Sequence, residues 1–148
     1  RKFMNISVDL LQKFNSLKAG KGFYGELAKD GSTPAAVVVT IHNGMVNYYC
    51  FTSQELTIKR YKQTDPLASV KLTEMEARNI FPDSSRTTYI YCGKSNWGRI
   101  PEEDFLKKLS TGVFSLKSEI SVELFEKIKS AVKNSKTMTP KLIKVLGI

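Results

Sequence analysis

The spacing of apolar residues changes several times along the chain, and each change predicts a new element. Leucine and phenylalanine recur at helical spacing between residues 10 and 17. Ser7 can cap this helix, and Gly20 and Gly22 can end it. The first segment is therefore predicted to be a helix.

Strand-like patterns follow from residue 23 onward. We expect a short strand over residues 23–28, a loop over 29–34 and a buried, valine-rich strand over 35–42. Asn43-Gly44 then predicts a type I′ turn, because both central residues of that turn need a positive φ. Residues 45–52 return as the partner strand.

The middle of the chain predicts three more short strands and one inserted helix. Residues 57–61 and 68–72 have strand-like composition, and 86–92 alternate between two faces. Between them, Thr73 and Glu76 have the spacing of a capping box, which predicts a short helix ending at residues 81–83.

Helical signals dominate the rest of the chain. Pro101 is expected at the first position of a short helix, Ser121 caps a longer one, and Thr139 precedes a final helix that ends at Gly147. After Glu126 every charged residue is a lysine. A solvated helix face explains these lysines, and contact with RNA remains the alternative.

Composition places the chain among ordinary globular proteins. It has 148 residues, of which 41% are hydrophobic and 25% charged, so we expect one α+β domain over residues 1–148. No apolar run approaches the roughly 20 residues that span a bilayer. The amino terminus also lacks the apolar core of a secretory signal. We therefore expect a cytoplasmic protein with no membrane partner.

Charge and residue types narrow the chemistry. The formal net charge of +9 favours a polyanionic partner such as RNA. Cys50 and Cys92 lie far apart in apolar runs, and His42 is the one histidine, so we expect free thiols, no metal site and no cofactor. Lys21 lies between two glycines, but this stretch is too short for a phosphate loop. A serine-histidine-aspartate triad is also disfavoured.

Polar residues at a strand end suggest a different route. Thr52 and Ser53 follow an apolar strand, and Lys29 lies in a nearby loop. RNA cleavage needs no metal, because the neighbouring 2′-hydroxyl is a nucleophile that the protein has only to align, deprotonate and assist with charge. The composition is compatible with this route but does not select it.

Two sequence resemblances also favour metal-independent RNA cleavage. Residues 22–27 (GFYGEL) and 31–39 (GSTPAAVVV) resemble the first hairpin of MazF/PemK (Kid)-type toxins. Residues 48–53 (YYCFTS) are similar to the strand that ends in threonine or Thr-Ser at their active site. Residues 2–7 (KFMNIS) and the helix after them resemble the opening of the ToxN/AbiQ/CptN-type (type III) toxins, which a small RNA inhibits.

The resemblance implies both a fold and an activity. The fold would be a small twisted antiparallel β barrel with an N-terminal helix, an inserted short helix and C-terminal helices. The activity would be that of a toxin-antitoxin endoribonuclease acting in phage defence. Such an enzyme is metal-independent and sequence-selective, and it cleaves single-stranded RNA to leave a 2′,3′-cyclic phosphate. A structured RNA antitoxin is favoured over a protein with an acidic tail, and an oligomer or protein-RNA assembly is compatible with this reading.

The residues expected to act fall into two groups. Thr33 stands where MazF relatives often carry a catalytic arginine before proline, so Lys29 or Arg86 would supply the positive charge. The residues expected at the catalytic site are Lys29, Thr52, Ser53 and Arg86. Those expected to bind RNA are Lys21, Tyr24, Lys59, Arg60, Tyr61, Lys62 and Lys94.

Each role has a structural alternative. Thr52 and Ser53 can simply cap a strand end, Lys29 can be a solvated loop residue, and Trp97 is expected in a core or an interface. His42 is expected only to flank the turn. For the whole protein, the alternatives are a non-catalytic nucleic-acid-binding module and a protein-interaction domain whose C-terminal helices form an oligomer interface.

Overall fold

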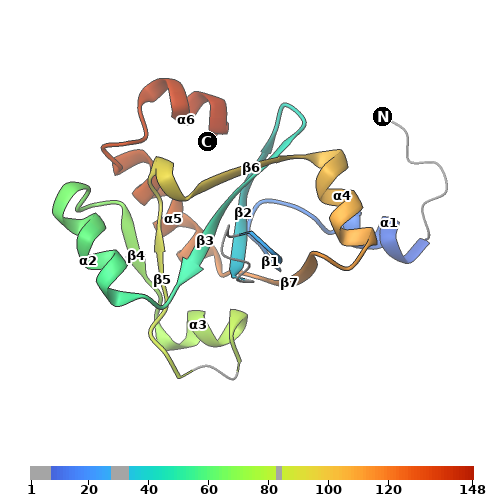
Figure 1. Cartoon of the computed structure of the whole chain (residues 1–148), viewed down its shortest axis with the longest axis horizontal. Helices are drawn as coiled ribbons and strands as arrows, with labels where there is room; N and C mark the ends of the chain where they lie inside the picture. Colours follow the sequence, from blue (N-terminus) through green and yellow to red (C-terminus); the bar gives the residue numbers. More distant parts are fainter. Residues whose placement is uncertain (1–7, 28–33, 83–84) are drawn as a thin grey trace.

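Strands and helices alternate along the chain, as predicted for an α+β protein. The computed structural model describes residues 8–27, 34–82 and 85–148 (Figure 1). Its strands are β1 (Lys21–Tyr24), β2 (Ala35–His42), β3 (Met45–Thr52), β4 (Ser69–Lys71), β5 (Tyr89–Tyr91), β6 (Trp97–Pro101) and β7 (Ser115–Glu119). Its helices are α1 (Val8–Asn15), α2 (Glu55–Thr64), α3 (Glu74–Ile80), α4 (Glu102–Ser110), α5 (Val122–Asn134) and α6 (Pro140–Leu146), with a 3₁₀ turn η1 (Lys94–Asn96). Ser7, Lys29 and Thr33 lie outside the described residues.

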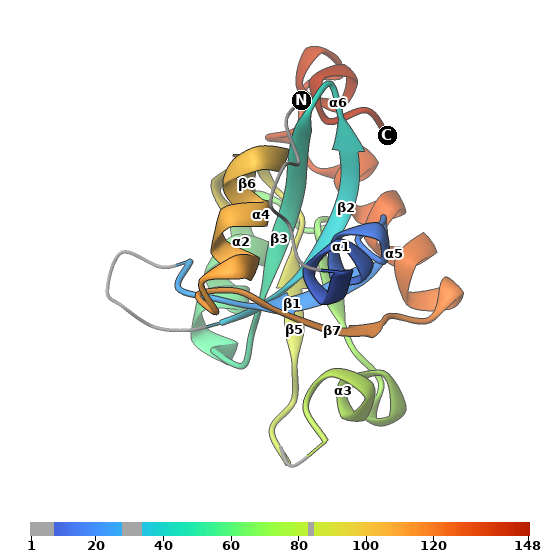
Figure 2. The same cartoon turned by 90° about the vertical axis from the view of Figure 1, so that its right-hand side faces the viewer.

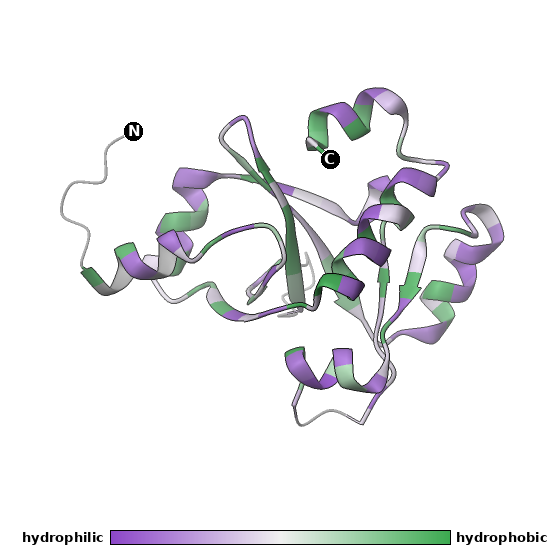
Figure 3. Cartoon of the chain, turned by 180° about the vertical axis from the view of Figure 1, so that it is seen from behind, coloured by the Kyte–Doolittle hydropathy of each residue, from purple (hydrophilic) through white to green (hydrophobic). Residues whose placement is uncertain are grey.

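The β2–β3 hairpin is the centre of the fold, with the predicted bounds of both strands confirmed. Asn43 has φ 52° and Gly44 has φ 74°, as the predicted turn requires. Val37 and Val39 belong to one core, whereas Ala36 and Val38 belong to another on the opposite face of β2. Both faces of β2 are buried over residues 35–39, which explains the run of valines. Figure 3 colours the ribbon by hydropathy and shows hydrophobic stretches in the long central strands.

Helices cover the sheet on several sides (Figures 1 and 2). Ile128 of α5 and Leu146 of α6 pack into the core that contains Val37. Phe105 of α4 packs into the core on the other face. Ile58 of α2 packs with Tyr89 and Tyr91 in a third, smaller cluster. None of the helices in the described ranges is long and apolar enough to cross a bilayer.

The strands form a seven-stranded antiparallel sheet in the order β4-β5-β3-β2-β1-β7, and β6 pairs with β3. Along the edge of β3 that faces away from β2, Met45–Tyr49 pair with β6 and Phe51–Thr52 pair with β5. In Figure 2, β1 and β7 cross β2 and β3 steeply, so the sheet is strongly twisted. Within the described residues β4 and β7 do not pair to close it, so the barrel that we predicted is not confirmed.

One predicted strand is wrong. Residues 57–61 belong to helix α2, not to a strand. Ile58, Tyr61 and Asp65 are spaced at about one and two helical turns, and all three face inward, with Asp65 only 1% exposed. Packing of this face against β5 outweighs the strand propensity of the local sequence.

Other predicted bounds shift. The first strand begins and ends earlier than residues 23–28, and only the centre of residues 86–92 is a strand. Pro101 ends β6 and precedes α4 instead of occupying its first position. The sequence patterns also missed β6 and β7.

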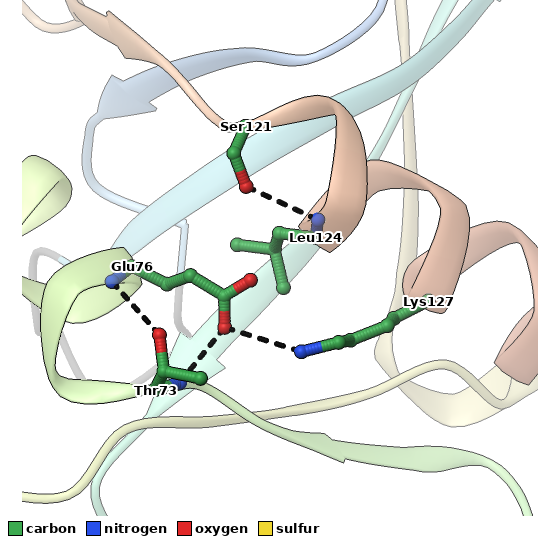
Figure 4. Close-up of polar contacts among 5 residues, drawn as sticks. All are labelled: Thr73, Glu76, Ser121, Leu124 and Lys127. Carbon is green, nitrogen blue, oxygen red and sulfur yellow. Dashed lines mark hydrogen bonds and ion pairs between the residues drawn. The ribbon is translucent and has the colours of Figure 1, made fainter.

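The helix caps predicted at Thr73 and at Ser121 are confirmed. Thr73 and Glu76 make both hydrogen bonds of the capping box, and the Ser121 hydroxyl accepts from the Leu124 amide (Figure 4). The Glu76 carboxylate also lies 3.5 Å from the Lys127 ammonium, which links α3 to α5. This contact helps to fix α3 beside the end of the sheet where β3 ends and β5 begins.

Candidate functional site

Four strand ends meet at one end of the sheet because neighbouring strands are antiparallel. Tyr24 at the end of β1 pairs with Ala35 at the start of β2. Thr52 at the end of β3 pairs with Tyr89 at the start of β5. Residues that are distant in the sequence therefore come together here, next to α3 (Figure 1).

A pocket of about 350 Å³ opens at this end, and we call it the strand-end pocket. Its polar lining residues are Tyr24, Thr52, Ser53, Arg86 and Thr88. Its apolar lining residues are Pro34, Ala35, Phe51 and Phe81. Four residues selected from the sequence, Tyr24, Thr52, Ser53 and Arg86, thus line one cavity. Lys29 lies outside the described residues, in the segment that leads to Pro34.

The polar groups of this pocket suit an anion. The guanidinium of Arg86 can match phosphate with two parallel N–H donors. The Thr52 hydroxyl accepts a hydrogen bond of 3.0 Å from the Gln54 amide, which is the strand-end capping considered above. Because a hydroxyl accepts and donates at once, Thr52 can still donate its proton to a ligand.

An aromatic wall closes one side of the strand-end pocket. The ring centroid of Phe81 lies 6.1 Å from that of Tyr24 and 6.1 Å from that of Phe51, both in edge contacts. The Lys117 ammonium lies 4.8 Å from the centre of the Tyr24 ring. Sequence reasoning missed Phe81, which it used only to end a helix, and Lys117, which lies on the unpredicted strand β7.

Two further depressions adjoin the strand-end pocket. One, of about 690 Å³, shares Arg86 and Thr88 with it and extends along α3 to Lys71. The other, of about 570 Å³, shares Tyr24 and Phe81 with it and extends to Lys117. The strand-end pocket therefore has a neighbouring depression on the side of Arg86 and another on the side of Tyr24.

Most of the residues expected to bind RNA lie elsewhere. Lys21 starts β1 opposite Glu119, at the far end of that strand from Tyr24. Lys59, Arg60 and Lys62 are exposed on α2. None of these four lines the strand-end pocket.

Tyr61 and Lys94 are placed together, but away from the strand-end pocket. Tyr61 stacks on Tyr91, with ring centroids 3.7 Å apart and planes 9° apart, so one of its faces is already covered. Its hydroxyl contacts Ser95, the neighbour of Lys94, at 3.2 Å. The Lys94 side chain is exposed, and its amide donates to the Thr137 hydroxyl.

Other nucleophiles and bases are poorly placed. Burial raises the pKa of the Cys50 thiol to about 11 and raises the pKa of Cys92 further, so both free thiols stay protonated near neutral pH. His42 flanks the hairpin turn, as predicted, about 25 Å from the strand-end pocket along a strand of 8 residues. Among the described residues, no three His, Cys, Asp or Glu side chains form a group that can hold a metal ion.

Trp97 has a structural role, as expected. It packs against the main core, and its indole N–H donates to the Asn47 side chain at 3.0 Å. It is therefore not a free stacking surface for RNA.

The chain has no match among models of protein families or among curated proteins.

Proposed function

We propose that this protein is a metal-independent, sequence-selective endoribonuclease of the toxin type, and that the strand-end pocket holds the phosphate that is cleaved. The observation that carries the proposal is the convergence of Tyr24, Thr52, Ser53 and Arg86 on one cavity. These residues come from three separate stretches of sequence, and the sequence patterns predict catalytic roles for Thr52, Ser53 and Arg86 and an RNA-binding role for Tyr24. A net charge of +9 favours the same substrate class.

In the proposed reaction, the 2′-hydroxyl of the RNA gives its proton to water while its oxygen attacks the adjacent phosphorus. The bond from phosphorus to the 5′-oxygen breaks and this oxygen takes a proton from water, which leaves a 2′,3′-cyclic phosphate and a free 5′-hydroxyl. Arg86 stabilises the extra negative charge of the pentacoordinate phosphorus, and the hydroxyls of Thr52 and Ser53 donate hydrogen bonds to its oxygens. Lys29 is proposed as a second cation, and Tyr24 either donates its hydroxyl or stacks on a base.

The surroundings of the pocket favour an endonuclease over an exonuclease. An enzyme that cuts inside a strand must accommodate nucleotides on both sides of the cleaved bond. The depressions beside Arg86 and beside Tyr24 provide space on two sides of the strand-end pocket.

The toxin class, the cell compartment and the inhibitor are part of the same proposal. The resemblance to MazF/PemK and ToxN/AbiQ-type toxins favours membership of that barrel superfamily, action in the cytoplasm and neutralisation by a small structured RNA. A non-catalytic nucleic-acid-binding module remains the second candidate. It is favoured by one observation: the described residues of the pocket include no carboxylate or histidine that could act as a base.

The test is cleavage of mixed single-stranded RNA by the purified protein in EDTA, with the new ends mapped. We expect selective cuts with cyclic-phosphate ends, reduced about a hundredfold or more in Arg86→Ala and in Lys29→Ala. Arg99→Ala is the matched control, because Arg99 is also an exposed arginine but lies over Trp97, outside the pocket.

The outcomes separate the two candidates. RNA that stays intact but is bound by the folded wild-type protein would favour the binding module. Equal loss of cleavage in Arg86→Ala and Arg99→Ala would remove the special role of Arg86.

A further inference from the structure

The depression beside Tyr24, which we call the side pocket, has a lining unlike that of the strand-end pocket. Tyr24 and Phe81 form the wall between the two, and Asn79, Lys117 and Ser118 lie on the far side of this wall. The side pocket exists because α3 packs beside β7, which brings Asn79 and Lys117 to the same cavity.

The lining of the side pocket combines the groups that recognise a nucleobase. Aromatic rings such as Tyr24 and Phe81 offer faces and edges against which a base can pack. The side-chain amide of Asn79 presents both a donor and an acceptor, the pattern that reads the edge of a base. Asn79 is exposed, and within the described residues its side chain makes no hydrogen bond, so the amide is available to a ligand.

Lys117 completes this arrangement. Its ammonium lies 4.8 Å from the centre of the Tyr24 ring, the ring that lines both pockets. A strand with one phosphate in the strand-end pocket and the neighbouring base in the side pocket would run past this ammonium. A lysine at this position would contact the phosphate backbone of the RNA. It would add affinity without distinguishing one base from another.

We infer that the side pocket binds one nucleobase of the RNA, adjacent to the phosphate held in the strand-end pocket, and that Asn79 selects its identity. This inference rests on the proposed function. It assigns the sequence selectivity of the enzyme to α3, a helix with no part in the proposed bond cleavage.

The experiment measures binding without cleavage. Fluorescently labelled tetranucleotides with 2′-fluoro riboses lack the attacking hydroxyl, and each position in turn carries A, C, G or U in a uridine background. Dissociation constants are measured for the wild type, Asn79→Ala, Asn79→Asp and Lys117→Ala. Asn134→Ala and Lys133→Ala are matched controls, because these residues are exposed on α5, outside both pockets. Thermal melting confirms that each variant is folded.

We expect the wild type to prefer one base at one position by about tenfold, the scale of a good two-bond contact to a base edge. Asn79→Ala should abolish that preference at that position alone. Asn79→Asp should shift it toward cytosine, whose amino group donates to a carboxylate. Lys117→Ala should weaken binding of all sequences equally.

Two results would overturn the inference: a preference that persists unchanged in Asn79→Ala, or a wild type with no preference at any position. Either result is compatible with cleavage of RNA by the wild-type protein. The inference can therefore fail while the proposed function holds. Conversely, loss of the preference in Asn79→Ala, in a protein that cuts no RNA, would support the base-binding side pocket and refute the nuclease.

Discussion

The two ends of the β2–β3 hairpin carry similar polar residues in opposite situations. At the turn end, Trp97 donates to Asn47, Asn47 donates to Thr40 at 3.0 Å, and the Thr40 hydroxyl donates to the Leu146 carbonyl. Asn47 is fully buried. This chain of hydrogen bonds joins β2, β3 and β6 to α6, which lies beside the turn (Figure 1).

At the strand end, about 17 Å from Asn47 along β3, the hydroxyls line a pocket instead. Within the described residues, the Thr52 hydroxyl makes one hydrogen bond, which it accepts from the Gln54 amide, and Ser53 is exposed. The difference separates two uses of the same chemistry. Polar groups that satisfy one another stabilise the fold, whereas polar groups that face a cavity remain available to a ligand.

Removing one hydroxyl from each end of the hairpin tests this difference most directly. Thr52→Val should lower RNA cleavage about a hundredfold, because it removes the hydroxyl that we propose as a donor to the phosphate, and should change stability little. Thr40→Val should do the reverse. It should lower the free energy of unfolding by about 1–3 kcal/mol, because the Leu146 carbonyl and the Asn47 amide lose their partner, and should leave cleavage near the wild-type rate. Cleavage rates and urea unfolding measure the two effects.

Thr52→Ser and Thr40→Ser serve as controls, because serine keeps the hydroxyl. Both should resemble the wild type. If Thr52→Val proved strongly destabilising and cleavage fell only in proportion to the unfolded fraction, the functional role of Thr52 would be refuted.

A second closed network, around Asp65, predicts how stability depends on pH. The Asp65 carboxylate accepts hydrogen bonds from Ser135 at 2.5 Å, the Lys136 amide at 2.8 Å and Tyr91 at 2.8 Å. Burial alone would raise the pKa of Asp65, but these hydrogen bonds outweigh it and hold the pKa below its ordinary value. Asp65 therefore stabilises the fold above its unfolded pKa of about 3.9, and this contribution is lost as pH falls through the folded pKa.

We expect Asp65→Asn to lower the free energy of unfolding by about 2 kcal/mol at pH 7, the scale of hydrogen bonds to a charged group. The difference from the wild type should shrink as pH falls from about 4 through the lower folded pKa, because the wild-type carboxyl becomes protonated over that range. Urea unfolding between pH 7 and pH 2.5 measures this difference in the free energy of unfolding. Glu119→Gln is the control: Lys18 also lowers the pKa of Glu119, but that carboxylate is exposed, so little change is expected. A constant difference at all pH values would contradict the prediction.

Sequence patterns predicted the parts of the fold that depend on local chemistry. The Asn43-Gly44 turn, the capping box at Thr73 and the cap at Ser121 each follow from a few neighbouring residues. Helix α2 could not be predicted in this way, because the inward position of Ile58 is decided by packing against β5. The same holds for β7, whose Leu116 is half-buried while its other residues are exposed, so no alternation marks it as a strand.

The candidate site was predicted in part for the same reason. Thr52 and Ser53 could be found because they end an apolar strand, and Arg86 because it precedes one. The aromatic wall at Phe81 and the side pocket at Asn79 depend on where α3 packs relative to the sheet, which local patterns do not encode. The segment around Lys59 was predicted to be a strand but is a helix, and Lys59 does not line the strand-end pocket.

The anchoring of α3 gives the smallest predicted effect. The Glu76 carboxylate, 9% exposed, accepts from the Thr73 amide at 2.8 Å and lies 3.5 Å from the Lys127 ammonium (Figure 4). Glutamine can replace glutamate in a capping box, so Glu76→Gln should lose only the ion pair, at a cost below about 1 kcal/mol. Glu76→Ala also loses the capping bond, and we expect about 1 kcal/mol more.

Thermal melting of both variants measures these costs. Glu74→Gln is the control, because Glu74 forms an exposed ion pair with Arg78 on the same helix and should contribute less. If Glu76→Gln cost as much as Glu76→Ala, the contact with Lys127 would carry the anchoring, and the capping box would not. In either case α3 should stay folded enough to keep Phe81 and Asn79 at their pockets, since Ile80 is buried in the main core. Base preference should therefore survive in both Glu76 variants and be lost only in Asn79→Ala, which separates the anchoring of this helix from its proposed role in recognition.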